Sequence, residues 1–186
     1  NYTFLHGASH PEELVERADA LGYTALALTD ECSVAGVVRA HVACRGRRLR
    51  LLIGSRFHLE EGVAIILIAR NRAGYGQLCT LISDARLRAP KGSYRIACTH
   101  LEHATDQCLA LLCGDPEAHP TTLEKTGRWL HRCFPGRAWI GVALLLGAAD
   151  RQHLHRLQAL AQAVDLPLVA IGDVHMHQRE RRPLQD

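Results

Sequence analysis

Short apolar runs alternate with stretches of helical periodicity along most of the chain. Alternation of this kind predicts an α/β fold with a mainly parallel sheet, either open or closed into a barrel. The apolar runs predict strands over residues 24–28, 50–53, 63–69, 109–112, 139–144 and 167–171. The periodic stretches predict helices over residues 10–21, 33–44, 74–84, 121–133 and 151–164.

The last apolar run leads directly into Asp173, His175 and His177, which alternate with other residues. A continuous apolar run suits a parallel strand that is covered on both faces. Alternate residues of an extended chain share a face, so these three side chains are expected to point to one side. A carboxylate beside imidazoles is a donor set for a divalent metal.

Polar residues also follow earlier strands, and each has a structural interpretation beside a functional one. Asp30 and Glu31 end the strand at 24–28, Arg56 ends the strand at 50–53, and Asp115 ends the strand at 109–112. Strand ends that converge are where α/β folds place ligand sites. Asp30 is equally well explained as a cap of the following helix, and Glu31 as an acid in its first turn.

Two local patterns predict how particular elements begin or connect. Ser9 and Glu12 have the spacing of a capping box, in which the hydroxyl at the N-cap and the carboxylate three residues later satisfy free helix N–H groups. Glu60-Glu61-Gly62 predicts a hairpin turn between two strands.

The composition is that of a globular chain, with 186 residues of which 47% are hydrophobic and 22% charged. This length favours one domain. The net charge of +3 favours nucleic acid or phosphate only weakly, and an aromatic content of 5% does not favour stacking platforms for single-stranded nucleic acid. The seven cysteines contain no C-x-x-C pair, which argues against a zinc ribbon and for free thiols in a reducing compartment.

The stretch from Ala85 to Gln107 is the least regular and contains a basic loop. Its cations surround a proline and a glycine, which mark a loop. It is interpreted either as a solvated basic loop or as a DNA-contacting module. The cations are Arg86, Arg88, Lys91 and Arg95.

Several segments resemble one known family. Leu28–His41 resembles the second motif of the polymerase and histidinol phosphatase (PHP) domain, in the version found in bacterial C-family error-prone DNA polymerases. Four further segments are similar to other parts of that domain. They are Gly7–Val15, Leu67–Cys79, Arg88–Gly92 and Gly172–Asp186.

The resemblance implies a distorted (β/α)7 PHP barrel, with its first strand partly or wholly missing from the given chain. It implies a PHP domain over residues 1–178, followed at 179–186 by the start of the connection to the next polymerase domain. The metals of the family lie at the C-terminal mouth of the barrel.

Carried over by motif, Asp30 takes the position of a ligand aspartate, and Glu31 stands where metal-binding members have a histidine. Asp173 and His175 match the closing Asp-x-His pair of ligands, whereas no family ligand corresponds to His177.

Three departures weaken this site. The family's opening His-x-His is expected before Asn1, Arg56 replaces the glutamate of a Gly-x-Glu motif, and Ala143 takes the place of a further carboxylate. A guanidinium beside a divalent cation is electrostatically unfavourable. We therefore expect no three-metal phosphoesterase centre: a divalent metal (Zn²⁺, Mn²⁺ or Mg²⁺) would bind a degenerate site, or none would bind.

The resemblance implies a structural and interaction domain of an error-prone DNA-directed DNA polymerase, a nucleotidyltransferase of damage-induced mutagenesis and translesion repair synthesis. Nucleotide addition would use Mg²⁺ and residues outside this chain, so no catalytic residue is expected here. The alternative is an active metal-dependent phosphoesterase of the 3′–5′ exonuclease or pyrophosphatase type. The implied partners are the rest of the polymerase chain, DNA, dNTPs and other mutagenesis and replication proteins such as the sliding clamp, in the cytoplasm and without a membrane.

Overall fold

A computed structural model describes residues 7–102 and 105–184. The chain divides into two compact units, which we call the first unit (1–56 and 174–186) and the second unit (57–173). The sequence predicts that the first strand of the barrel is partly or wholly missing from the given chain. This prediction falls outside the described residues. Among the described residues, no helix combines the length and the apolar character needed to cross a membrane.

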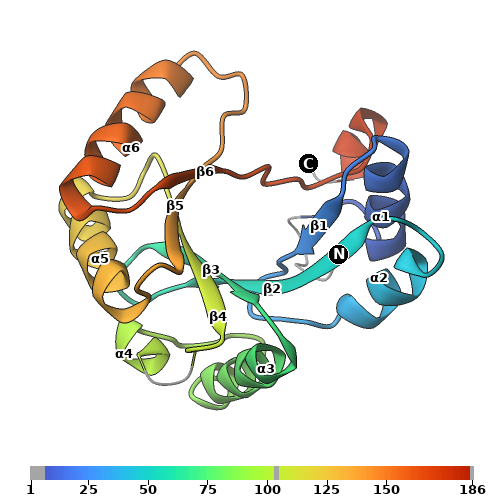
Figure 1. The fold of residues 1–186 in the computed structure, drawn as a ribbon, viewed down its shortest axis with the longest axis horizontal. Coiled ribbons are helices and arrows are strands. Elements are labelled where there is room, and N and C mark those ends of the chain that lie inside the picture. The colour runs from blue at the N-terminus through green and yellow to red at the C-terminus, as the bar shows by residue number, and fades with distance from the viewer. Residues whose placement is uncertain (1–6, 103–104, 185–186) are drawn as a thin grey trace. The chain divides into compact units, whose positions relative to one another are not determined.

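In the first unit, two helices pack on a pair of parallel strands (Figure 1). The helices are α1 (Pro11–Ala20) and α2 (Val37–Cys44), and the strands are β1 (Ala25–Leu28) and β2 (Arg50–His58), whose last two residues belong to the second unit. The 3₁₀-helix η1 (Arg179–Leu184) also belongs to the first unit.

The core of the first unit lies between these helices and one face of the strands. Val15 and Ala40 are fully buried on the two helices, and Leu28 and Leu49 are buried on the strand side. Burial of a valine or leucine side chain contributes about 1.5–3 kcal/mol, and that of the smaller alanine side chain contributes less. The helix pair is further held by ion pairs of Arg39 with Glu12 and Arg47 with Asp19.

Four strands form the sheet of the second unit. They are β3 (Ala64–Ala69), β4 (Cys108–Cys113), β5 (Ala138–Val142) and β6 (Leu168–Ala170). β3 pairs with β4 in the antiparallel sense, whereas β4–β5 and β5–β6 are parallel. The expectation of a mainly parallel sheet is therefore confirmed, with β3 as its exception.

Four helices accompany this sheet. They are α3 (Arg72–Leu87), α4 (Cys98–Leu101), α5 (Pro120–Cys133) and α6 (Asp150–Val164). α3 packs on β3, while α5 and α6 pack on each other and on the parallel strands. The predicted turn before β3 is confirmed, because the Leu59 N–H donates to the Val63 carbonyl at 2.8 Å.

Three predictions about strands are wrong. β2 continues to His58 instead of ending at Ile53, so Arg56 lies within it. β5 ends at Val142 rather than at Leu144, and β6 is a three-residue strand that is not buried on both faces. The Ile171 N–H makes the last hydrogen bond to β5, and Asp173 then turns the chain with a φ of 42°. Beyond that point β6 offers β5 no backbone hydrogen-bond partner, and β5 therefore ends at Val142.

The predicted cap of α1 is also wrong. His10, not Ser9, is the N-cap, and Glu13, not Glu12, accepts the hydrogen bond from the His10 N–H at 2.8 Å. The Ser9 hydroxyl is engaged elsewhere, since it contacts the backbone and the ring of His177.

Candidate metal site

The ends of β1 and β2 place the first two candidate ligands. Glu31 forms a parallel bridge with Arg56, which keeps the register that pairs Leu28 with Ile53. The Arg56 N–H donates to the Asp30 carbonyl at 3.1 Å, and the Cys32 N–H donates to the Arg56 carbonyl at 2.9 Å. The strand pairing therefore continues past β1 without a bulge.

This register puts Glu31 and Arg56 on one face of the strand pair. Directly paired residues of parallel strands share a face, and neighbours along a strand alternate. Leu28 and Ile53 pack on the core of α1 and α2. Glu31 and Arg56, three residues further along each strand, lie on the opposite face.

Asp30 lies on the helix-covered face with Ser55. Asp30 is 5% exposed and Ser55 is fully buried. The Ser55 hydroxyl donates to the Asp30 carbonyl at 2.8 Å and accepts the Ser33 N–H at 3.0 Å, which fixes the loop after β1. Asp30 and Glu31, neighbours in sequence, thus point to opposite faces.

The closing pair of candidate ligands follows β6. Asp173 is exposed and has a left-handed φ of 42°, and it ends the second unit. His175 is half-buried in the first unit, where its carbonyl accepts the Ala8 N–H at 2.8 Å. The positive φ of Asp173 interrupts the extended backbone, so the expected alternation of Asp173, His175 and His177 along one strand is wrong.

His177 joins the C-terminal part of the first unit to the residues at the start of α1. The Ser9 hydroxyl lies 2.6 Å from its Nδ1 and accepts its backbone N–H at 2.9 Å. The Glu13 Oε2 lies 3.8 Å from the same nitrogen, and the Arg181 guanidinium donates to Glu13 at 2.6 Å. Only 10% of the His177 side chain is exposed. This cluster, which we call the α1 anchor (Ser9, Glu13, His177 and Arg181), ties the end of the chain to the start of α1.

The described residues of each unit do not by themselves make up a complete metal centre. Neither unit, taken by itself, brings together three His, Cys, Asp or Glu side chains of its described residues in an arrangement that holds a metal ion. Ala143, half-buried just beyond β5, has no donor atom in its side chain. Arg56 adds a cation on the face that carries Glu31, which opposes a divalent cation there.

The cysteines among the described residues join no such group of three ligands either. All seven are free. Burial, with a smaller contribution from Glu61, raises the pKa of the Cys98 thiol to about 12, and burial raises that of Cys108 to about 11. With no metal bound, both thiols are therefore protonated near neutral pH.

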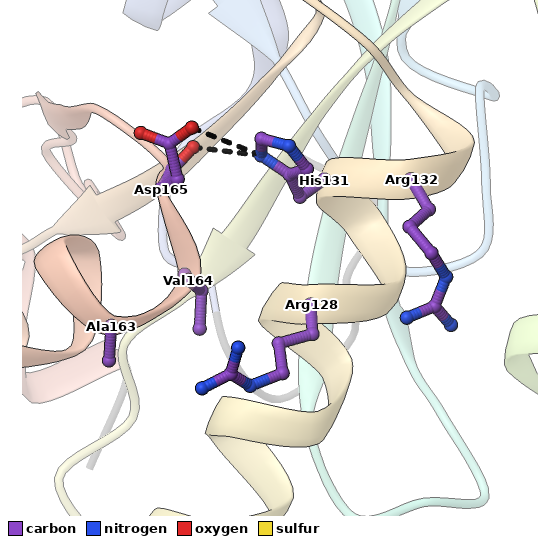
Figure 2. A pocket seen from close by; sticks show the side chains of 6 residues that line it. All are labelled: Arg128, His131, Arg132, Ala163, Val164 and Asp165. Atoms are coloured by element: carbon purple, nitrogen blue, oxygen red, sulfur yellow. Dashed lines mark hydrogen bonds and ion pairs between the residues drawn. The ribbon is translucent and has the colours of Figure 1, made fainter.

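A pocket on the second unit lies between α5 and α6 (Figure 2). Arg128, His131 and Arg132 line it from α5, and Ala163 to Asp165 line it from the end of α6. The His131 Nδ1 lies 2.9 Å from the Asp165 carbonyl, and Arg128 pairs with Glu124 at 2.7 Å. These contacts join the two helices and balance charge within the unit.

Two arginines of the basic loop form ion pairs with carboxylates, which neutralise part of its positive charge. The sequence left open whether this loop is solvated or contacts DNA. Arg95 pairs with Glu60 at 2.7 Å, and Arg88 lies 3.9 Å from Asp84. The side chains of both arginines remain exposed, at 66% and 42%. This pairing favours the solvated interpretation.

The chain matches the family model described as the PHP domain over residues 1–135. The chain belongs to the PHP domain family. This confirms the resemblance noted in the sequence.

Proteins named error-prone DNA polymerase are similar to this PHP domain over its whole length. Identity is 54% for the protein of Methylococcus capsulatus, 50% for that of Pseudomonas paraeruginosa and 49% for that of Dechloromonas aromatica. The chain spans 18% of the length of each of these relatives.

Two solved structures share the fold of this PHP domain. A predicted metal-dependent phosphoesterase from Bifidobacterium adolescentis has a TM-score of 0.65 and 16% identity, with 91% of this chain and 84% of that one covered. An amidohydrolase from Chromobacterium violaceum, described with bound sulfate and no metal, has a TM-score of 0.64 and 17% identity over 92% and 84%. These likenesses confirm the α/β class and the PHP fold expected from the sequence.

Proposed function

We propose that this chain is the PHP domain of an error-prone DNA-directed DNA polymerase and serves it as a structural domain. Support comes from relatives of that name with 49–54% identity across the whole chain. The parent protein would add nucleotides with Mg²⁺ at carboxylates outside this chain. Its partners would be the rest of the polymerase chain, DNA, dNTPs and replication proteins such as the sliding clamp, in the cytoplasm.

One observation carries the structural role. Glu31 and Arg56 are directly paired on the same face, at the positions where metal-binding relatives are expected to place two ligands. This pairing is one of the backbone, and it brings a guanidinium to the face that carries the Glu31 carboxylate. A guanidinium on that face would offset the carboxylate charge, as a metal ion would, but it offers neither Lewis acidity nor a bound water. The candidate ligands Asp30, Glu31, Asp173 and His175 would then be remnants of a degenerate site, each contributing to the fold of its own unit and not to catalysis.

The second candidate function is metal-dependent phosphoester hydrolysis. It is favoured by the presence of Asp173 and His175 in the pattern of the closing ligand pair, and by the likeness to a phosphoesterase fold. Zn²⁺, Mn²⁺ or Mg²⁺ would have to bind these residues.

Hydrolysis by the full-length protein separates the two functions. The substrates are p-nitrophenyl phosphate, single-stranded DNA and pyrophosphate, each with Mn²⁺ or Zn²⁺. We expect no release above that of an Asp173→Ala variant. Hydrolysis that disappears in Asp173→Ala would establish the phosphoesterase and reject the structural role. Primer extension by the same preparation tests the polymerase assignment, and its absence would reject it.

A further inference from the structure

The turn between α2 and β2 carries the densest cluster of positive charge in the chain. Residues 45–50 read Arg-Gly-Arg-Arg-Leu-Arg, so arginine occupies four positions out of six. We call the residues Arg45, Arg48 and Arg50 the arginine patch. All three are exposed.

The fourth arginine neutralises the acids of this region. The Arg47 guanidinium donates to the Asp19 carboxylate at 2.8 Å and to the Ala43 carbonyl at 2.9 Å, and it lies 3.8 Å from the Glu16 carboxylate. Among the described residues, no carboxylate forms an ion pair with a member of the arginine patch. The patch therefore keeps its full positive charge.

The backbone of the patch is fixed. Gly46 has a φ of +76°, and the Arg47 N–H donates to the Cys44 carbonyl at 3.1 Å, which closes a tight turn. Leu49 is 3% exposed and packs in the core, so it holds Arg48 and Arg50 on either side of it at the surface. A preformed turn loses little entropy when its arginines bind a ligand.

An exposed aromatic ring lies beside the patch. The Arg50 N–H donates to the Thr24 carbonyl at 3.0 Å, which places Tyr23 next to the start of β2. Tyr23 is 60% exposed. Arginine binds phosphate through a planar fork of donors, and an exposed tyrosine stacks on an unpaired base.

We propose that the arginine patch and Tyr23 form a binding site for single-stranded nucleic acid. The arginines bind successive phosphates, and Tyr23 stacks on one base. Binding to phosphates alone would suit duplex or single strand, but only a single strand offers an unpaired base to the tyrosine. The site uses none of the candidate metal ligands, and it rests on this cluster of side chains and not on the polymerase assignment.

The test is the salt dependence of oligonucleotide binding by the full-length protein. Fluorescence anisotropy with a labelled oligo-dT follows the affinity of the wild type and of the Arg45→Gln/Arg48→Gln/Arg50→Gln variant. With three phosphate contacts removed, we expect the slope of log K against log salt to fall by about 2. Tyr23→Leu should weaken binding to oligo-dT by about five- to tenfold, whereas Tyr23→Phe should retain it.

A charge-matched variant controls for the change in net charge. Arg72, Arg132 and Arg151 are also exposed, and their replacement by glutamine should leave the slope unchanged. Equal effects of the two triple variants, or no effect of the patch variant, would overturn the proposal. Competition by poly-glutamate as strong as by oligo-dT of equal charge would overturn it as well, because it would assign the patch to acidic proteins.

Discussion

Ser9 connects two parts of the chain that lie 168 residues apart, because its hydroxyl contacts both the backbone N–H and the ring of His177. It is 5% exposed, so water does not replace these contacts easily. Glu13 completes the connection through Arg181. At the scale of single residues, the first unit is held together by this α1 anchor.

Ser9→Ala should destabilise the protein. The His177 N–H would stay buried without its acceptor, which costs about 1–3 kcal/mol. Urea unfolding measures the loss. Ser93→Ala is the control, because Ser93 is exposed and bonds only the nearby Pro90 carbonyl, and surface changes of this kind stay within about ±0.5 kcal/mol. Equal effects of the two substitutions would contradict the anchor.

Glu13 gives the anchor a pH dependence. The hydrogen bond from the His10 N–H, with the charges of Arg181 and His177, lowers the pKa of the Glu13 carboxyl from its ordinary 4.5. The folded state thus favours the ionised form. Its contribution to stability is complete above pH 4.5 and is lost as the pH falls through the lowered pKa.

Arg181→Gln should move the pKa of Glu13 back toward 4.5 and shift acid unfolding to higher pH. NMR titration of the Glu13 carboxyl and circular dichroism below pH 5 measure the two effects. Arg179→Gln makes the same change of charge in η1, at an exposed residue, and should leave both unchanged. A Glu13 pKa that does not respond to Arg181→Gln would refute this contribution.

At the scale of elements, the start of α3 shows how closely one helix is fitted to its neighbours. The Asn71 side chain caps the helix by accepting the Gly74 N–H at 2.9 Å. A Cβ on Gly74 would lie 2.2 Å from the Gln107 carbonyl oxygen. Gly76, two residues further on, is exposed and has nothing within 4 Å of such a Cβ.

The two glycines of α3 should therefore respond in opposite ways to alanine. Gly74→Ala should cost about 1–3 kcal/mol, because a backbone carbonyl must move. Gly76→Ala should stabilise by about 0.5–1 kcal/mol, since alanine favours the helix. Thermal unfolding of both variants gives the comparison, and a destabilising Gly76→Ala with a neutral Gly74→Ala would disprove the packing described.

The sequence predicts the presence of the helices and strands better than the residues at which they begin and end. The periodicity of α6 and the apolar run of β4 are sufficient to predict these two elements, because α6 has a buried stripe and β4 is buried along its length. The α1 cap was misassigned because the competing partner of Ser9 is His177, far along the chain. The early end of β5 depends on where β6 stops, which no local pattern encodes.

The sequence also contains information on the geometry of the candidate site. Strand alternation alone places Asp30 and Glu31 on opposite faces of the strand. The replacement of a glutamate by Arg56 was visible in the sequence through the family resemblance. The turn at Asp173 was not, because a left-handed aspartate leaves no mark in the hydrophobic pattern.

At the scale of the whole molecule, the chain has the PHP fold, and the role proposed for it is structural. The fold matches phosphoesterase and amidohydrolase structures with TM-scores of 0.65 and 0.64 at 16% and 17% identity. The packing that maintains the fold, such as the core under β1 and β2 and the α1 anchor, needs no metal.

Metal content tests this account most directly. The full-length protein and its Asp173→Ala variant are incubated with Zn²⁺ or Mn²⁺, freed of unbound metal by gel filtration and analysed by inductively coupled plasma mass spectrometry. We predict the same metal content for both proteins, because the proposed structural role assigns Arg56, paired with Glu31, to the place of a metal ligand. A stoichiometric metal ion in the wild type that Asp173→Ala removes would contradict the account.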